Sequence, residues 1–188
     1  MRGVVLWVRI TFTTRVMIKV GEKAPEFSHV KAYKAGEFVN ISLSDYKGKY
    51  VVLFFYPRDF TFICPTEIKE FAKLEKDFEK ANAVIVGAST DSEHSHKAWF
   101  ERDLSEVKYP ILADTTQQIS RDYNVLDTDG SSQRGTFIID PEGKLAWMMV
   151  SGNSVGRSVK ETLRSLQALQ MGELCPVEWT PGQETLGK

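Results

Sequence analysis

The sequence has few cysteines, no excess of one charge and no long apolar run. Only two of its 188 residues are cysteines, which excludes the dense disulfide framework of a small secreted domain. Its 24 Lys and Arg side chains are balanced by 25 Asp and Glu, so neither nucleic acid nor a membrane surface is an expected partner. No apolar run approaches the roughly 20 residues that cross a bilayer. We expect a globular domain in the reducing cytoplasm.

Motifs of other common sites are also missing. The GxGxxG dinucleotide loop, the Walker phosphate loop and the HExxH zinc motif do not occur. His94 and His96 stand two residues apart on a predicted helix, so we expect them on a solvated polar face rather than as a metal pair. The segment 127–130, "DTDG", resembles part of a calcium loop without its downstream ligands. We therefore expect neither a metal nor an organic cofactor.

The apolar pattern predicts one α/β domain. Residues 50–56, "YVVLFFY", are a uniformly apolar run that is typical of a strand buried on both faces. Apolar side chains then recur every three or four residues from Ile68 to Phe78, which predicts an amphipathic helix as far as Lys80. The alternation of such segments predicts a mixed central sheet with helices on both faces. The further predicted strands are 83–90, 109–114, 135–140 and 144–150, and the further predicted helices are 92–103, 116–123 and 159–169.

The pattern also divides the chain into three parts. Residues 1–16 contain three arginines and no acidic residue, and we interpret them as a disordered extension or a misassigned start. Residues 17–170 carry the alternating strands and helices and form the predicted domain. Residues 171–188 contain three glycines and two prolines without periodicity, so we interpret them as a C-terminal arm. This arm carries the second cysteine, Cys175.

The first cysteine, Cys64, stands at the predicted junction between a strand and a helix. Pro65 has no backbone N–H and is tolerated only in or near the first turn of a helix, so the helix must begin close to Cys64. The sulfur then lies near unpaired backbone N–H groups at the positive end of the helix dipole, where a thiolate is stabilised. Thr61 adds a hydroxyl that can donate to the thiolate or to a bound oxygen atom. From position alone, a reactive thiol and an inert buried cysteine are equally open.

The segment around Cys64 resembles the active-site signature of peroxiredoxins. Pro57, Thr61 and Cys64 match its P-x-x-x-T-x-x-C spacing, and "FFYPRDFTFICPTEI" is similar to the two-cysteine subfamily throughout. The likeness continues through "VGEKAPEF", "STDSEHSHKAW", "RGTFIID" and "VGRSVKETL" to "GELCPVEW", and covers nearly all of residues 17–182. The resemblance implies a thioredoxin-like fold. It also implies a thiol peroxidase similar to thioredoxin peroxidases and to the peroxidase component of alkyl hydroperoxide reductases, without metal, haem or flavin.

The resemblance implies a role for each residue that matches. Cys64 matches the peroxidatic cysteine, whose thiolate attacks a peroxide oxygen and becomes a sulfenic acid. Thr61 matches the residue that hydrogen-bonds the thiolate and the peroxide, and Pro57 matches the proline that closes the pocket. Arg134 matches the arginine whose guanidinium lies beside the sulfur. The pair expected to orient this arginine is Glu67 and Arg157.

Cys175, in "ELCPVEW", matches the resolving cysteine of these proteins. The resemblance implies that it attacks the Cys64 sulfenic acid of the partner subunit and forms an intersubunit disulfide in a homodimer, with dimers assembled into a decamer. Hydroperoxides are the expected substrates, and thioredoxin or a flavoprotein disulfide reductase is the expected electron donor. Trp179 is expected to anchor the arm by burying an aromatic face. Strand 144–150 is expected at the sheet edge, where it would pair across the dimer.

Two departures from the family pattern bear on this mechanism. Relatives that are sensitive to hyperoxidation carry a Gly-Gly-Leu-Gly insertion, which the segment 100–110, "FERDLSEVKYP", lacks, and a C-terminal Tyr-Phe helix, which is also missing. The chain therefore resembles the robust bacterial type, in which Cys64 is released more easily. In addition, only residues 171–174 separate the last predicted helix from Cys175, which shortens the reach of the arm.

Three other functions stay open at this point. A thiol–disulfide oxidoreductase of the thioredoxin type would carry a second cysteine at position 67, where this chain has Glu67. A one-cysteine thiol peroxidase would use Cys64 without Cys175. A redox-regulated chaperone or sensor scaffold would depend on the assembly rather than on turnover.

Overall fold

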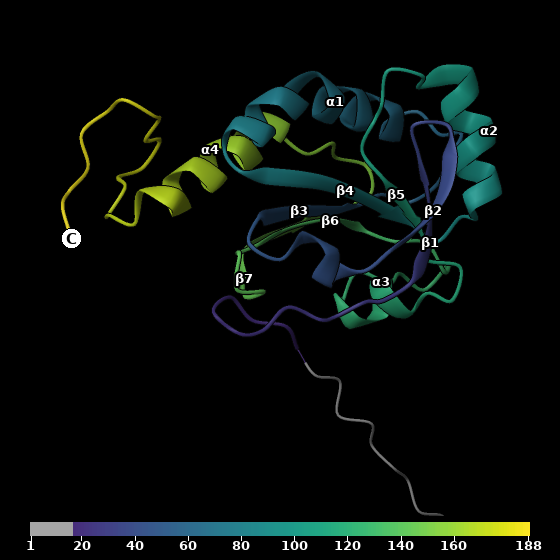
Figure 1. Cartoon of the computed structure of the whole chain (residues 1–188), viewed down its shortest axis with the longest axis horizontal. Helices are drawn as coiled ribbons and strands as arrows, with labels where there is room; N and C mark the ends of the chain where they lie inside the picture. The colour runs from purple at the N-terminus through teal and green to yellow at the C-terminus, as the bar shows by residue number, and fades with distance from the viewer. Residues whose placement is uncertain (1–16) are drawn as a thin grey trace, which may run out of the picture.

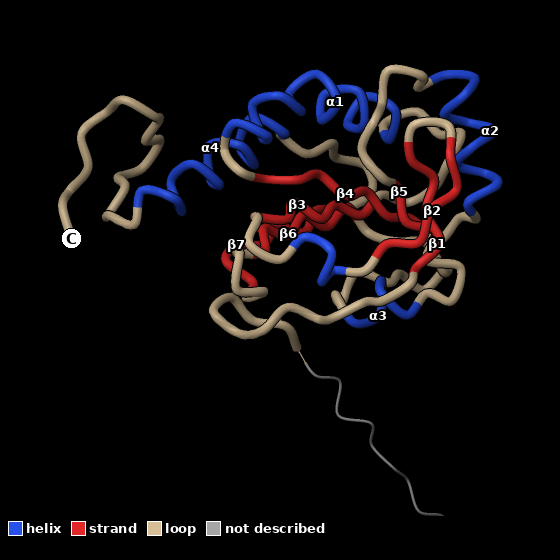
Figure 2. Tube along the Cα trace, in the orientation of Figure 1, coloured by secondary structure: helices blue, strands red, loops and turns tan. Residues whose placement is uncertain are grey.

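The computed structural model describes residues 17–188, and Figures 1 and 2 show how they are arranged. The interpretation of residues 1–16 as an extension lies outside this part of the chain. The strands are β1 (Val30–Lys34), β2 (Glu37–Ile41), β3 (Tyr50–Phe55), β4 (Ala83–Ser89), β5 (Ile111–Ala113), β6 (Arg134–Ile139) and β7 (Leu145–Ser151). The helices are the short 3-10 helix η1 (Leu43–Tyr46), α1 (Cys64–Lys80), α2 (Glu93–Asp103), α3 (Gln118–Asp122) and α4 (Val159–Met171).

All seven strands form one sheet in the order β2-β1-β5-β4-β3-β6-β7. β3, β4 and β5 run parallel to one another, whereas the β1–β2, β1–β5, β3–β6 and β6–β7 pairs are antiparallel. Parallel neighbours need a crossover connection, and α1 and α2 supply the two crossovers. Side chains of α1, α2 and α4 share a core on one face of the sheet, and those of α3 and η1 share a core on the other (Figure 1). The prediction of a mixed sheet with helices on both faces is confirmed.

β3 is an inner strand, so both of its faces are buried. Val52 and Phe54 belong to the core under α1, whereas Leu53 and Phe55 belong to the core on the opposite face. Phe71 of α1 stacks on Phe54, and the two ring centroids are 4.3 Å apart. Fully burying a side chain of this size stabilises the fold by about 1.5–3 kcal/mol. This packing fixes α1 over β3.

The topology brings Cys64 and Arg134 to the same end of the inner strands. α1 begins at Cys64 with Pro65 in its first turn, as the sequence predicts, and it therefore begins just beyond the carboxyl end of β3. β6 runs antiparallel to β3, so its first residue, Arg134, lies at the same end. Seventy residues of sequence separate the two side chains, yet the strand directions alone place them together.

The sequence pattern predicts five strands, and the two that it misses form the β1–β2 hairpin. The segments "VKAYK" and "EFVNI" mix charged and apolar residues without regular alternation, so neither gives a strand signal. The turn between them has positive φ at Ala35 (48°) and Gly36 (99°), the backbone that a two-residue hairpin requires. β7 forms the edge of the sheet, as predicted, and its pairing across a dimer stays a prediction.

Candidate active site

Cys64 is the first residue of α1 and is fully buried. Residues 57–63, called here the β3–α1 loop, lead into it. The first turn of the helix closes on Ile63, because its carbonyl accepts from the backbone N–H groups of Thr66 (3.0 Å) and Glu67 (3.4 Å). These amides are therefore already paired. The hydrogen-bond donor that reaches the Cys64 sulfur comes from a different element.

That donor is Arg134, which belongs to a buried cluster of charged side chains. Its Nη1 lies 3.5 Å from the Cys64 Sγ and 2.6 Å from Oε2 of Glu67. The other carboxylate oxygen, Oε1, accepts from the backbone N–H (2.8 Å) and from Nε (3.0 Å) of Arg157. All four residues are at least nine-tenths buried. The structure thus brings together the cysteine, the arginine and the orienting pair that the resemblance predicts.

Arg157 is held on every side of its guanidinium. Its five side-chain N–H groups make five hydrogen bonds, which saturates the group. Burial lowers the pKa of Arg157 from its ordinary value, and the charge and hydrogen bonds of Glu67 oppose that shift. The ring of Phe54 packs 5.3 Å from the guanidinium carbon. The acceptors are Glu67, the carbonyls of Phe55 and Gly135, and the Thr136 hydroxyl.

A residue that the sequence does not point to completes the setting of Arg134. The carbonyl of Asn153, in the turn after β7, accepts from both Nε (3.1 Å) and Nη2 (3.0 Å) of Arg134. Glu67 and Asn153 therefore accept hydrogen bonds from two sides of the Arg134 guanidinium. Any residue type can supply a main-chain carbonyl, so no sequence signal marks position 153.

Thr61 and Pro57 are partly buried in the β3–α1 loop. The Thr61 hydroxyl donates to the carbonyl of Arg58 at 3.0 Å. A hydroxyl has a single proton, so Thr61 must rotate before it donates to the sulfur or to a peroxide. Pro57 lies two residues after the end of β3. Its expected role in closing the pocket stays a prediction.

Asp59 anchors the β3–α1 loop to α2 through buried hydrogen bonds. Its carboxylate accepts from the Tyr56 hydroxyl (2.8 Å) and the Ser95 hydroxyl (2.7 Å), and it contacts Nδ1 of His96 at 2.8 Å. Burial and the negative charge of Asp59 raise the pKa of Tyr56 well above its ordinary value. The backbone N–H of Asp59 also donates to Asp91 (2.8 Å). Asp59 therefore fixes the loop five residues before the helix begins.

The expectation that both histidines of α2 face solvent is wrong for His96. His94 is exposed, but His96 is fully buried with Trp99 and Phe100 on the inner face of the helix. A buried imidazole needs partners for both ring nitrogens. Asp59 and the carbonyl of Leu112 provide them. The acceptor comes from a distant loop, so helix periodicity alone gives no indication of this burial.

Cys175 lies far from Cys64 in the same subunit. Its Sγ is 3.8 Å from the carbonyl of Ala168 near the end of α4, and Gln170 at that end contacts Ala81 at the end of α1. Cys64 is at the opposite end of α1, whose 17 residues span about 25 Å. Both cysteines are free thiols. The structure does not bring the two sulfurs together.

The arm that carries Cys175 projects beyond the end of α4 (Figure 1). It closes on itself, since the backbone N–H of Leu174 donates to Gly187 and that of Leu186 donates to Leu174. Trp179 is 2% exposed, so its predicted burial is confirmed. Its carbonyl accepts from Arg164 of α4 at 3.0 Å, which ties the arm to the helix.

Known proteins share this fold and most of this sequence. A family model described as the AhpC/TSA family matches residues 20–148. Peroxiredoxin prdx-2 of Caenorhabditis elegans is 52% identical over 177 residues, which cover 89% of this chain and 88% of that protein. The reduced 2-Cys peroxiredoxin of Plasmodium vivax, a solved structure, matches with a TM-score of 0.84 and 38% identity over 88% of this chain and 91% of its own. The chain belongs to the peroxiredoxin family.

Membership establishes the class of chemistry and the fold of this peroxiredoxin. It is a thiol peroxidase with a thioredoxin-like fold. Putative peroxiredoxin YkuU of Bacillus subtilis, 47% identical over 175 residues, covers 89% of this chain and 97% of its own length. The family places the reaction on a cysteine, and Cys64 with its charged neighbours is the candidate.

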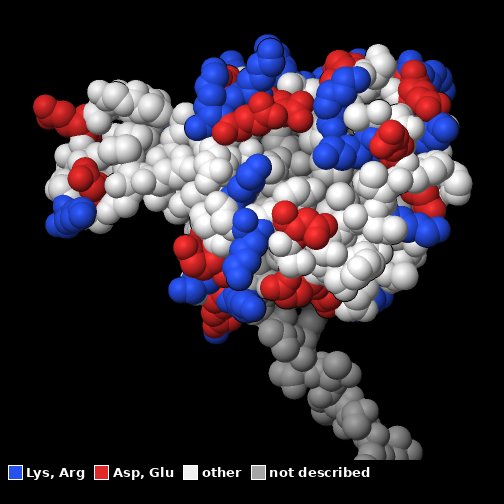
Figure 3. Space-filling view, viewed as in Figure 1, with Lys and Arg blue, Asp and Glu red and all other residues white. Residues whose placement is uncertain are grey.

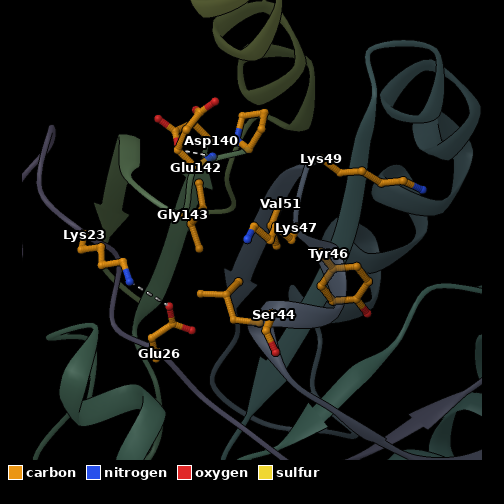
Figure 4. A pocket seen from close by; sticks show the side chains of 13 residues that line it. Lys23, Glu26, Ser44, Tyr46, Lys47, Lys49, Val51, Asp140, Glu142 and Gly143 are labelled. Atoms are coloured by element: carbon orange, nitrogen blue, oxygen red, sulfur yellow. Dashed lines mark hydrogen bonds and ion pairs between the residues drawn. The ribbon is translucent and has the colours of Figure 1, made fainter.

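A surface hollow of about 280 Å³ lies away from the candidate site (Figure 4). Tyr46 of η1, Val51 near the start of β3, and Asp140 after β6 contribute to its walls. The start of β3 is the opposite end from Cys64, so this hollow is not the place where peroxide meets the thiol. Within residues 17–188, no group of three or more His, Cys, Asp and Glu side chains is placed to hold a metal ion.

The visible surface carries both signs of charge. Figure 3 shows acidic and basic side chains interleaved over the body of this peroxiredoxin, and mostly uncharged residues over the arm. The arm exposes Leu174, Val177 and Leu186. None of the helices in the described part of the chain is long and apolar enough to cross a membrane.

Proposed function

We propose that Cys64 reduces hydrogen peroxide and organic hydroperoxides. Its thiolate attacks one peroxide oxygen, the O–O bond breaks, and the other oxygen takes up a proton and leaves as water or an alcohol. Cys64 is then a sulfenic acid. A nucleophilic thiolate and a donor for the departing oxygen are the two requirements of this step.

The buried charges support Cys64 as the nucleophile. Arg134 and Arg157 share one carboxylate, Glu67, so these three side chains carry one surplus positive charge. A buried uncompensated charge is costly, and a thiolate at Cys64 neutralises the cluster. The 3.5 Å contact between Arg134 Nη1 and the Cys64 Sγ is the observation that carries the proposal.

The surrounding residues then take separate roles. Asn153 uses one of the two hydrogens on Nη2 of Arg134, and we assign the other to the peroxide oxygen on which charge develops. Thr61 donates its hydroxyl proton to the sulfur or the peroxide after rotating away from Arg58. Pro57 limits access of water. Glu67 and Arg157 hold Arg134 in place and do not touch the substrate.

The second step is assigned to Cys175 of the partner subunit. Its thiol attacks the Cys64 sulfenic acid, water leaves, and an intersubunit disulfide forms. The position of Cys175 at the far end of α4 supports a partner rather than the same subunit, because α1 lies lengthwise between the two sulfurs. Only the short stretch 171–174 leads to Cys175, so the distance that this thiol must cover to the partner's Cys64 is the most demanding part of the proposal.

The assembly and the electron donor follow from the same proposal. A homodimer is required by the intersubunit disulfide, and the exposed Met148 and Val150 on the edge strand β7 support pairing there, with dimers forming a decamer. Thioredoxin or a flavoprotein disulfide reductase returns the electrons. The end of α4 at Met171 supports the proposed boundary between the domain, 17–170, and the arm, 171–188. The cytoplasmic location stays a prediction.

Peroxide consumption by the wild type, Cys64→Ser and Cys175→Ser, together with non-reducing gels, tests the proposal. Cys64→Ser is expected to lose consumption, and oxidised wild type is expected to run as a disulfide-linked dimer. Undiminished consumption by Cys64→Ser would end the proposal. Wild type that turns over without a linked dimer would leave the one-cysteine mechanism instead.

A further inference from the structure

The β3–α1 loop contacts α2 through the aromatic ring of Phe60. The Phe60 and Trp99 ring centroids are 5.8 Å apart. The guanidinium carbon of Arg102 lies over the Phe60 ring, 4.8 Å from its centroid. Trp99 and Arg102 are three residues apart and therefore share one face of the helix. Phe60 is packed against both.

Phe60 adopts a backbone conformation that its side chain disfavours. Its φ is +56°, in the left-handed region where the Cβ of a non-glycine residue crowds the following carbonyl. A bulky residue keeps such a conformation only where its surroundings over-determine it. The contacts with Trp99 and Arg102 hold Phe60 in this conformation.

The two residues that follow Phe60 give the loop little contact with α2. The Thr61 hydroxyl bonds within the loop, to the carbonyl of Arg58. The Phe62 side chain is 94% exposed. Asp59 is anchored to α2 by its hydrogen bonds. Phe60 is the next residue of the loop that contacts α2. Four residues later the chain reaches Cys64.

We propose that Arg102 is a positioning residue for the peroxidase reaction. Its guanidinium, seated over Phe60, holds the β3–α1 loop against α2 and so limits how often Cys64 leaves its buried site. The inference rests on the proposed function, in which Cys64 must leave that site before Cys175 of the partner attacks. Arg102 touches neither Cys64 nor the substrate in this role, and acts through Phe60.

The consequence is a change in the fate of the sulfenic acid. While the loop stays in place, a second hydroperoxide can oxidise Cys64 to the sulfinic acid, with loss of water or an alcohol. When the loop opens, the partner's thiol forms the disulfide and releases water. An exposed cation–π contact corresponds to about a two- to fivefold change in an equilibrium. Losing this contact raises the population with the loop open about two- to fivefold. The loop stays closed in most molecules, so the rate of the first step with peroxide changes little.

Three variants separate the contact from its neighbours. Arg102→Ala removes the guanidinium, Arg102→Lys keeps a cation on the same turn, and Asp103→Asn removes the ion pair of Arg102 without removing the group over Phe60. Arg121→Ala is a matched control, since Arg121 is also an exposed arginine in the last turn of a helix. All four changes lie at exposed or half-exposed positions.

Two measurements test the inference. Hydrogen exchange of the 60–64 amides in the reduced protein is expected to quicken about two- to fivefold in Arg102→Ala, partly recover in Arg102→Lys, and stay at the wild-type rate in the other two. Peroxide titration with mass spectrometry is expected to show about two- to fivefold less sulfinic acid per disulfide in Arg102→Ala, with the rate of the first step unchanged.

The outcomes are distinct. Unchanged exchange in Arg102→Ala overturns the inference, and so does quicker exchange with an unchanged ratio of sulfinic acid to disulfide. Neither result touches the proposed function, which wild-type peroxide consumption tests separately. If wild type forms no sulfenic acid at all, the proposed function fails, and the reaction role of Arg102 is overturned with it.

Discussion

Arg157→Lys is expected to destabilise the folded protein strongly, although it preserves the positive charge. The five N–H groups of Arg157 are all used, whereas a lysine ammonium offers three. At least two of these five buried hydrogen bonds are then lost, and each costs about 1–3 kcal/mol. The expected loss is about 2–6 kcal/mol from a typical total of about 5–15 kcal/mol.

Urea denaturation of the reduced protein, followed by circular dichroism, measures this loss through the shift in midpoint at constant slope. The control is Arg121→Lys, an exposed arginine on α3, which is expected to change stability by no more than about 0.5 kcal/mol. If the free energy of unfolding of Arg157→Lys lies within about 1 kcal/mol of the wild-type value, the hydrogen bonds of the Arg157 guanidinium do not stabilise the fold as expected.

Three further changes probe the site and the core. Glu67→Gln leaves two buried guanidinium groups without a carboxylate and is expected to cost about 3–5 kcal/mol in denaturation, and wild-type stability would contradict the charge argument. Thr61→Val removes a hydroxyl at little change in volume and is expected to slow single-turnover oxidation of Cys64 at least about tenfold, whereas an equal rate would exclude the rotating donor. Gly87→Ala places a Cβ 2.5 Å from the Ile111 side chain and is expected to cost about 1–3 kcal/mol; an unshifted midpoint would show that the core adapts.

The inner part of the fold is the part that the sequence predicts best. A strand buried on both faces must be apolar throughout, which is why residues 50–56 reveal β3. The start of α1 follows from Pro65 alone, because proline restricts where a helix can begin. β2 is the edge strand and β1 lies beside it, and both carry exposed charged residues, so their pattern is weak.

The candidate site is only partly visible in the sequence. Glu67, Arg134 and Arg157 come from α1, β6 and the segment before α4, and only the family resemblance selects them. Their mutual burial depends on strand directions that no local pattern encodes. The family resemblance does not identify the residues that support the site. Asp59 of the β3–α1 loop pairs with His96 of α2, and Asn153 contributes only its main-chain carbonyl.

The most direct test of the account is the chemical state of Cys64 after one equivalent of hydrogen peroxide. In Cys175→Ser the sulfenic acid cannot be resolved, so a dimedone adduct on the Cys64 peptide is expected by mass spectrometry, with the other residues unmodified. In the wild type the same treatment is expected to give a disulfide between Cys64 and Cys175 of two subunits. A Cys64 peptide that stays unmodified in Cys175→Ser while peroxide is consumed would contradict the central claim.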